Sequence, residues 1–190
     1  MNRAPEPSRA AYRAALAAFG GDGDVHKYLD QDESHKVDIL SCKDKPSPGL
    51  ISYSTLGVHA VSNLIEGQDI RVELAGVAED SFKSFPNLLS TAAFYVIKDR
   101  WKCRPGVVYM DLLNEYRLST TLEHLMWVEP FEWESLGSVD AAGVTIHWLM
   151  GIPISDSEDR YLRRNGFEKL ERLLIDREVD YWDLNRRPVV

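Results

Sequence analysis

The side chains that could perform catalysis are scattered along this sequence of 190 residues. No two histidines have the i, i+4 spacing of a zinc site on a helix, and no serine lies in a G-x-S-x-G turn. Phosphate-binding loops of the G-x-G-x-x-G and G-x-x-x-x-G-K types are absent as well. We therefore expect no catalytic residues, no metal and no cofactor. The histidines are His26, His35, His59, His124 and His147.

Two single residues have to be weighed between a chemical and a structural role. Cys103 lies between Lys102 and Arg104, whose charges favour a lowered thiol pKa. A lone thiol without an orienting histidine is weak support for a nucleophile, however. His147 lies in the apolar run VTIHWLM, where we expect a histidine of the core. The only other cysteine is Cys42, and two scattered thiols fit a reducing compartment.

The clearest functional pattern is acidic and aromatic. Residues 121–159 contain no lysine or arginine, but they hold eight acids and three of the five tryptophans. Within this window EPFEWE alternates acids with aromatic rings. Aromatic anchors surrounded by charge are typical of protein interfaces, and carboxylates speed the encounter with a basic partner. We therefore predict a partner-binding surface formed by Glu129, Phe131, Glu132, Trp133 and Glu134.

Other interpretations of the same residues stay open. Phe131 and Trp133 are as well explained as core residues, and for Trp127 and Trp148 a core position is the better explanation. A second acidic and aromatic segment, DREVDYWDL at 176–184, is either another binding surface or a sheet edge kept soluble by its charges.

Both helices and strands are needed to position these residues. Apolar spacing predicts a first helix that is capped by Ser8 and stops at Gly20, and a second whose apolar stripe runs from Phe85 to Ile97 and which ends before Arg104. The S-x-x-E capping box at 155–158 opens a last helix that continues past Gly166, where it either bends or meets another backbone closely. Alternating or apolar segments predict strands near 26–30, 35–42, 49–62, 70–78, 121–128 and 144–155. In the segment 70–78, Arg71 and Glu73 alternate with apolar residues, so we expect one face of this strand to be wet. Residues 107–118 fit either class, and the tail from 177 is a candidate edge strand. Because the strands cluster, the pattern favours an α+β fold.

Length and charge limit the function further. A chain of this size fits one domain over 1–190. The net charge of -8 disfavours direct binding to nucleic acid, which requires a basic surface. No apolar run reaches the roughly 20 residues of a membrane span, and the start lacks the apolar core of a signal peptide. We therefore expect a cytoplasmic protein that does not bind a membrane.

Several segments together resemble a known family. YSTLGVHAVS, the strand IRVEL followed by NLLSTAAFYVI, the later PGVVY, and the ending WLMGIPISDSE with NGFEKL are similar to the suppressor-of-fused domain. Within that family the chain resembles the bacterial antitoxins, or immunity proteins, of the YqcF type. The resemblance runs from about residue 9 to the C-terminus, and it rests on the order of these segments because none is diagnostic alone.

The resemblance implies an α+β domain with a mixed central sheet flanked by helices and no catalytic residues. It also implies neutralisation of a cognate toxin by direct protein binding, and toxins of such systems are often nucleases. Our leading hypothesis is therefore an antitoxin. A regulatory scaffold that captures a peptide segment of a partner is the alternative. The third hypothesis is an enzyme whose active site is assembled from distant residues and leaves no motif. The sequence does not identify the partner, the stoichiometry or the oligomeric state.

Overall fold

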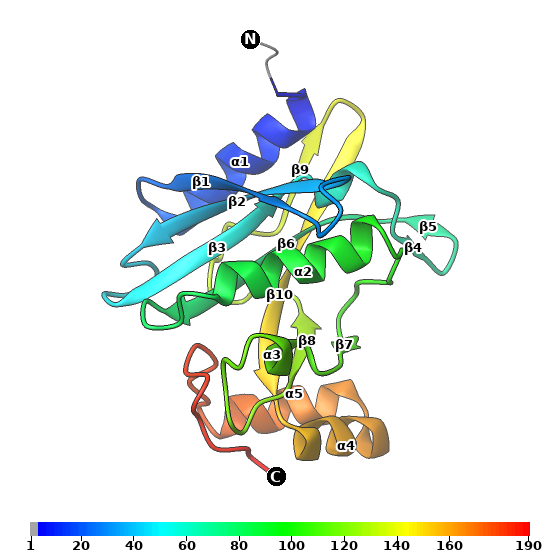
Figure 1. Ribbon diagram of the computed structural model, residues 1–190. Coiled ribbons are helices and arrows are strands. Elements are labelled where there is room, and N and C mark those ends of the chain that lie inside the picture. Colours follow the sequence, from blue (N-terminus) through cyan, green and yellow to red (C-terminus); the bar gives the residue numbers. More distant parts are fainter. Residues whose placement is uncertain (1–3) are drawn as a thin grey trace.

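A mixed, eight-stranded sheet organises residues 4–190, the part of the chain that the computed structural model describes (Figure 1). The strands run in the order β1-β2-β3-β6-β10-β8-β7, and β9 pairs with the first residues of β10. All neighbours are antiparallel except β6 and β10, which are parallel. The strands are β1 Asp24–Leu29, β2 Lys36–Lys43, β3 Leu50–Leu56, β6 Arg71–Glu79, β7 Val108–Tyr109, β8 His124–Val128, β9 Ser138–Ala141 and β10 Val144–Ile154. A separate small hairpin joins β4 (Leu64–Ile65) to β5 (Gln68–Asp69).

Helices cover both faces of this sheet (Figure 1). Helix α2 packs on β2, β3 and β6, while α1 packs on the opposite face against β2, β3, β9 and β10. Each face has its own apolar core, and the core on the α1 side continues to α5. The helices are α1 Glu6–Phe19, α2 Phe85–Ile97, α3 Leu112–Glu115, α4 Asp156–Asn165 and α5 Phe167–Asp176, with a 3-10 turn η1 at Val58–Ala60. No helix within residues 4–190 is long and apolar enough to cross a membrane.

Strand β6 shows how the two cores are built from one segment. Val72 and Leu74 belong to the core under α2, whereas Ala75 and Val77 belong to the core under α1. Gly76 lets α2 come close, because a Cβ atom there would lie 2.8 Å from the ring of Phe85. The α+β class with a mixed sheet is thus confirmed, and α2 extends over the whole predicted apolar stripe from Phe85 to Ile97.

The face of β6 that carries Glu73 is buried, contrary to the prediction. A strand with one wet face was expected, but Glu73 is fully buried. Its carboxylate accepts hydrogen bonds from the Thr55 hydroxyl and from the backbone N–H groups of Gly57, Val58 and His59. By capturing these donors, Glu73 ends β3 at Leu56, so the long strand predicted over 49–62 becomes a strand followed by a 3-10 turn.

Three further corrections concern the last third of the chain and helix α1. The predicted single helix is two helices, because Gly166 has φ 92° and ψ 160°, and this breaks the hydrogen-bond ladder between α4 and α5. The capping box of Ser155 and Glu158 is confirmed. Residues 177–190 form turns and not an edge strand. At the other end α1 begins at Glu6, so Ser8 lies in its first turn and does not cap it.

Candidate functional site

A groove lies beside β8 and α5 at the C-terminal end of the molecule, with a volume of about 520 Å³. Strands β8 and β10 supply its apolar floor, α5 forms one wall, and the segments after β8 and after α5 form the others. We call it the β8–α5 groove. It is lined by Met126, Val128, Glu129, Pro130, Phe131, Ile152, Glu171, Leu174, Ile175, Glu178, Val179, Asp180, Tyr181 and Trp182.

Local backbone geometry brings the two walls together. β8 ends at Val128, and Pro130 has no N–H group with which to continue the ladder. After α5, Glu178 adopts a left-handed φ of 49°. The N–H of Val179 then bonds the carbonyl of Leu174 at 3.2 Å, which turns the tail back across the groove.

The end of the tail is held by a buried ion pair. The Arg186 guanidinium donates to the Glu158 carboxylate at 2.8 and 3.0 Å and to the carbonyl of Pro153 at 2.8 Å. Glu158 also accepts the N–H of Val189 at 3.0 Å. The segment between α5 and Arg186, which supplies a wall of the groove, is therefore fixed at both ends.

The five residues predicted as a binding surface lie in different environments in the structure. Glu129 and Phe131 line the groove, and Phe131 is 55% exposed. Glu132 accepts a hydrogen bond from the Tyr181 hydroxyl and so joins the two walls. Glu134 is exposed but lies outside the groove lining.

The structure contradicts the prediction that Trp133 belongs to this surface. It is only 5% exposed and packs on Phe19 of α1, with ring centroids 4.7 Å apart. Phe131 and Trp133 therefore lie in different environments, because α1 offers an apolar surface to Trp133 alone. Trp127 and Trp148 are core residues, as expected.

The second acidic and aromatic segment meets the first one at this groove. Glu178, Asp180 and Trp182 lie in the lining together with Glu129 and Phe131, although some 50 residues separate the two segments in sequence. Tyr181 contacts Phe131 edge to face, with ring centroids 5.0 Å apart. The charged segment is therefore part of a concave surface and not a sheet edge.

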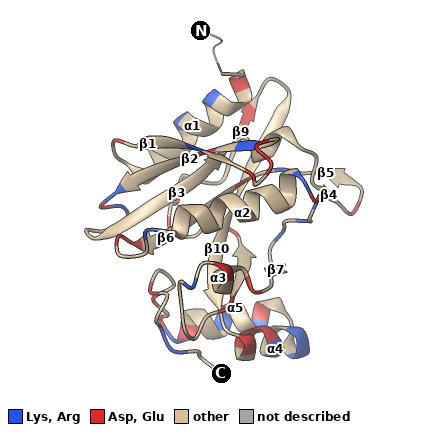
Figure 2. Cartoon of the chain, viewed as in Figure 1, with Lys and Arg blue, Asp and Glu red and all other residues tan. Residues whose placement is uncertain are grey.

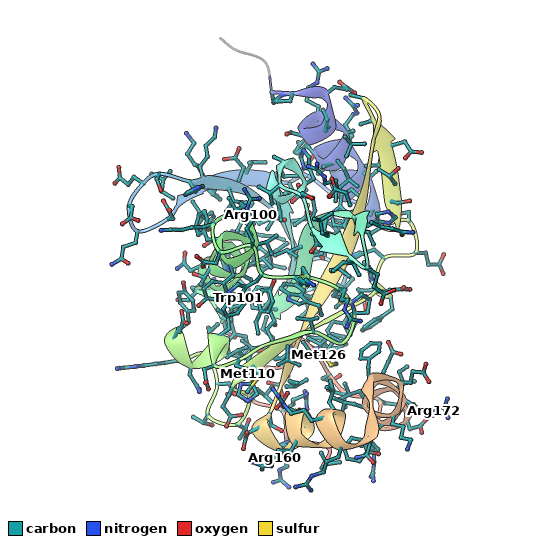
Figure 3. The ribbon with its side chains drawn as sticks, turned by 90° about the vertical axis from the view of Figure 1, so that its right-hand side faces the viewer. Arg100, Trp101, Met110, Met126, Arg160 and Arg172 are labelled. Carbon is teal, nitrogen blue, oxygen red and sulfur yellow. The ribbon has the colours of Figure 1, made fainter. Side chains whose placement is uncertain are left out.

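Sequence reasoning missed the contribution of α5. Ile175 is 68% exposed and Glu171 is half-buried, and both line the groove. The available signal was Ile175 itself, an isoleucine outside the inner stripe that ends with Leu170 and Leu174. Figure 3 shows that Arg172 extends from the far side of α5, away from Met126 of the groove floor.

The electrostatics of the groove are uniformly negative. Its charged lining residues are Glu129, Glu171, Glu178 and Asp180, and no lysine or arginine belongs to the described lining. Burial raises the pKa of Glu171, and the charges of Glu129 and Glu168 raise it further. Burial also raises the pKa of Tyr181, with Glu132 adding to the effect. Figure 2 shows the charged residues of α4 and α5 at this end of the molecule.

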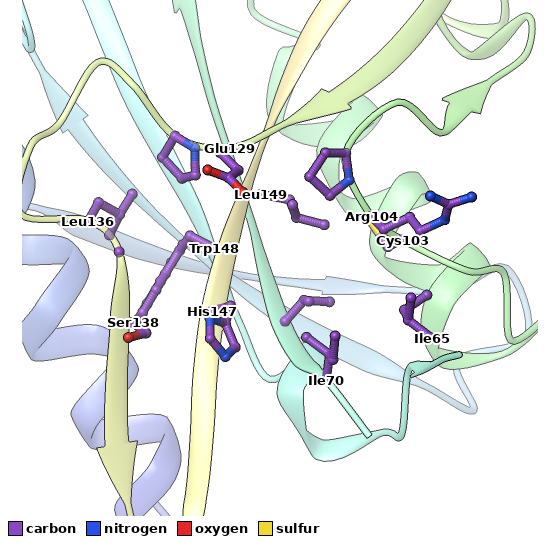
Figure 4. Close-up of a pocket in the computed structure, with 14 residues that line it drawn as sticks. Ile65, Ile70, Cys103, Arg104, Glu129, Leu136, Ser138, His147, Trp148 and Leu149 are labelled. Carbon is purple, nitrogen blue, oxygen red and sulfur yellow. The ribbon is translucent and has the colours of Figure 1, made fainter. Parts of the chain in front are cut away.

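A second hollow of about 460 Å³ lies on the other side of the Glu129–Pro130 corner (Figure 4). His147 lines it and is exposed, which corrects the expectation of a core histidine. The reason is that α2 covers β2, β3 and β6 and leaves this face of β10 open. Cys103 also lines this hollow but is buried, and burial raises the pKa of its thiol. The expected lowering by Lys102 and Arg104 is wrong, since the thiol points away from water.

Within residues 4–190 no three His, Cys, Asp or Glu side chains are grouped so that they could hold a metal ion. The fold and the groove define the chain as an α+β domain with an acidic, partly apolar concave surface. Comparison with known proteins gives the family. Residues 33–187 match the model of the suppressor of fused protein family, and the chain belongs to this family.

Relatives support the same assignment. The chain is 35% identical over 188 residues to the immunity protein YqcF of Bacillus subtilis, covering 97% of this chain and 98% of that protein. Its fold is similar to a putative suppressor of fused homolog from Neisseria gonorrhoeae, with a TM-score of 0.73, 15% identity and 97% of both chains covered. It is also similar to Drosophila Suppressor of Fused, with a TM-score of 0.68 and 15% identity. That match covers 97% of this chain and 52% of the Drosophila chain.

Proposed function

We propose that this protein is an immunity protein that neutralises a cognate toxin by direct binding, with the β8–α5 groove as the binding surface. The observation that carries the choice of surface is the meeting of two acidic and aromatic segments at one groove. The similarity to the immunity protein YqcF over almost the whole chain supports the role. Exposed apolar side chains within a charged rim give the layout of a protein interface.

We also propose that the toxin is a nuclease. A nuclease must present a basic surface to the phosphate backbone of its nucleic-acid substrate. The four carboxylates of the groove lining would match such a surface in charge and would occupy it in place of phosphates. The protein's net charge of -8 would speed the encounter of the two molecules.

The test is co-expression with the toxin encoded by the neighbouring gene. We expect the wild-type protein to restore growth and to bind the purified toxin in a stoichiometric complex. Phe131→Ala should weaken binding about tenfold or more, because truncation of an interface anchor costs about 1–2 kcal/mol or more. Leu64→Ala is the matched control, since Leu64 is 56% exposed on the small β4–β5 hairpin and Phe131 is 55% exposed.

Two results would contradict parts of this proposal. A wild-type protein that neither binds the toxin nor restores growth would refute the immunity role. If Phe131→Ala and Leu64→Ala weaken toxin binding equally, the immunity role stands but the groove is not the binding surface.

The alternative is a regulatory scaffold that captures a peptide segment of a partner. The concave shape of the groove favours it, because a short segment can occupy a groove by itself. Recovery of a short linear segment in place of a folded toxin domain would support this alternative.

A further inference from the structure

The β8–α5 groove has features that indicate the chemistry of its occupant. Phe131 and Ile175 are large apolar side chains that are 55% and 68% exposed, and both belong to the lining. The floor between them consists of buried apolar residues, Met126, Val128, Ile152 and Leu174. Covering the exposed side chains of Phe131 and Ile175 with apolar groups would remove them from water, which is the main driving force of association.

The charge of the rim has no counterpart within the groove. Its carboxylates repel each other, and the raised pKa of Glu171 reflects burial together with the nearby charges of Glu129 and Glu168. By contrast, several acids elsewhere are paired, such as Asp159 with Arg163 and Asp69 with Arg71. A positive charge from another molecule would supply the missing partner.

Aromatic rings stand beside these carboxylates. Phe131 and Tyr181 are nearly perpendicular at 83°, and Tyr181 and Trp182 at 76°, with centroids 5.0 and 4.7 Å apart. The three residues are neighbours in sequence of Glu129 and Asp180, which also line the groove. A lysine ammonium or arginine guanidinium over an aromatic face is attracted by the ring, and more strongly where water is displaced.

From this arrangement we propose that the groove binds a cationic, amphipathic segment of the partner protein. Apolar side chains of the segment lie on the floor against Ile175, and a lysine or arginine lies on the exposed Phe131 ring between the rim carboxylates. This inference rests on the proposed function, and it adds the chemical class of the bound segment. A small cation alone would leave the side chain of Ile175 exposed to water, so the occupant is a polypeptide.

The experiment uses two synthetic amphipathic peptides of equal length, one of leucine and arginine and one of leucine and glutamate. Each is titrated into the full chain labelled with ¹⁵N, and backbone shifts locate the binding site. We expect the arginine peptide to shift residues 129–131 and 171–182, and the glutamate peptide to leave them unchanged. Binding of both peptides alike, or shifts confined to other surfaces, would overturn the inference.

Charge variants test the contribution of the rim. Glu171→Gln with Asp180→Asn should weaken the arginine peptide about tenfold, because two charges that face the bound cation are lost. Asp22→Asn with Asp24→Asn is the matched control, since it removes the same charge from exposed positions near the β1 edge. Thermal unfolding of both double variants verifies that they are folded. Equal effects of the two pairs would mean that net charge alone attracts the peptide, and would overturn the inference.

The same variants separate this inference from the proposed function. If Phe131→Ala weakens the toxin complex while the rim variants leave it unchanged, the groove is the toxin site but does not recognise a cation. If the toxin is not bound at all while the arginine peptide occupies the groove, the immunity role fails and the chemistry of the occupant stands.

Discussion

Arg186→Met should destabilise the protein strongly, because it leaves a carboxylate buried without its counter-charge. Glu158 is completely buried, and Arg186 is 7% exposed. The two side chains form a bidentate pair at 2.8 and 3.0 Å. The substitution also removes the hydrogen bond of 2.8 Å that Arg186 donates to the carbonyl of Pro153.

The expected loss follows from what Glu158 retains. Breaking a buried ion pair by removing one partner costs about 3–5 kcal/mol. Glu158 still accepts the N–H groups of Ser155 at 2.8 Å and Val189 at 3.0 Å, which favours the lower end of that range. For a chain of this size each kcal/mol lowers Tm by about 2–4 °C, so a loss of about 3 kcal/mol lowers it by roughly 6–12 °C.

The assay is urea unfolding followed by fluorescence, with calorimetry for Tm. The double variant Glu158→Gln, Arg186→Met should recover part of the loss, since it buries no unpaired charge. Arg187→Met is the control, because Arg187 is exposed and its substitution should stay within about 0.5 kcal/mol. A loss below about 1 kcal/mol for Arg186→Met would refute the view that this pair anchors the tail.

Three further predictions concern single residues. Gly166→Ala should lower the free energy of unfolding by about 1–3 kcal/mol, whereas Gly137→Ala should be nearly neutral. A Cβ atom would meet no neighbour at either position, but of the two glycines only Gly166 has a positive φ. Asp30→Asn should lower Tm at neutral pH. The His35 N–H and ring, Ser34 and Lys98 lower the pKa of Asp30, so this contribution is lost as pH falls through the acid range, and the Tm difference should vanish there. Glu171→Gln should raise Tm of the free protein at neutral pH, with a gain that shrinks on acidification, since a raised carboxyl pKa disfavours the charged folded state. A gain that grows on acidification would contradict this assignment.

The secondary structure was largely predictable where local pattern and packing agree. The apolar residues from Phe85 to Ile97 form an unbroken i, i+3, i+4 stripe with a proline in the first turn, and α2 extends over the whole stripe. The capping box at Ser155 is likewise a local signal, since both partners lie within one turn. The strand predicted over 49–62 is longer than β3, because the end of β3 depends on Glu73, some 17 residues away.

The candidate site was predictable only in its composition. The sequence indicated two acidic and aromatic segments, but it could not pair them, and it treated Phe131 and Trp133 alike. Burial of Trp133 depends on Phe19 of α1, whereas Phe131 meets only the edge-to-face contact of Tyr181 and stays 55% exposed. His147 differs from its expected core environment because the covering of β10 by helices depends on the tertiary structure.

The amino-acid sequence by itself determined the α+β class, the helical spacing of apolar residues and the net negative charge. It also determined which segments are rich in acids and aromatic rings. These properties follow from local spacing and composition, which are the same in any fold. Only the tertiary structure decided that Glu129 and Phe131 meet Glu178, Asp180 and Trp182 in one groove with α5. Proximity across some 50 residues comes from sheet order and from the turn at Glu178, and neither is encoded in the spacing of the residues that meet.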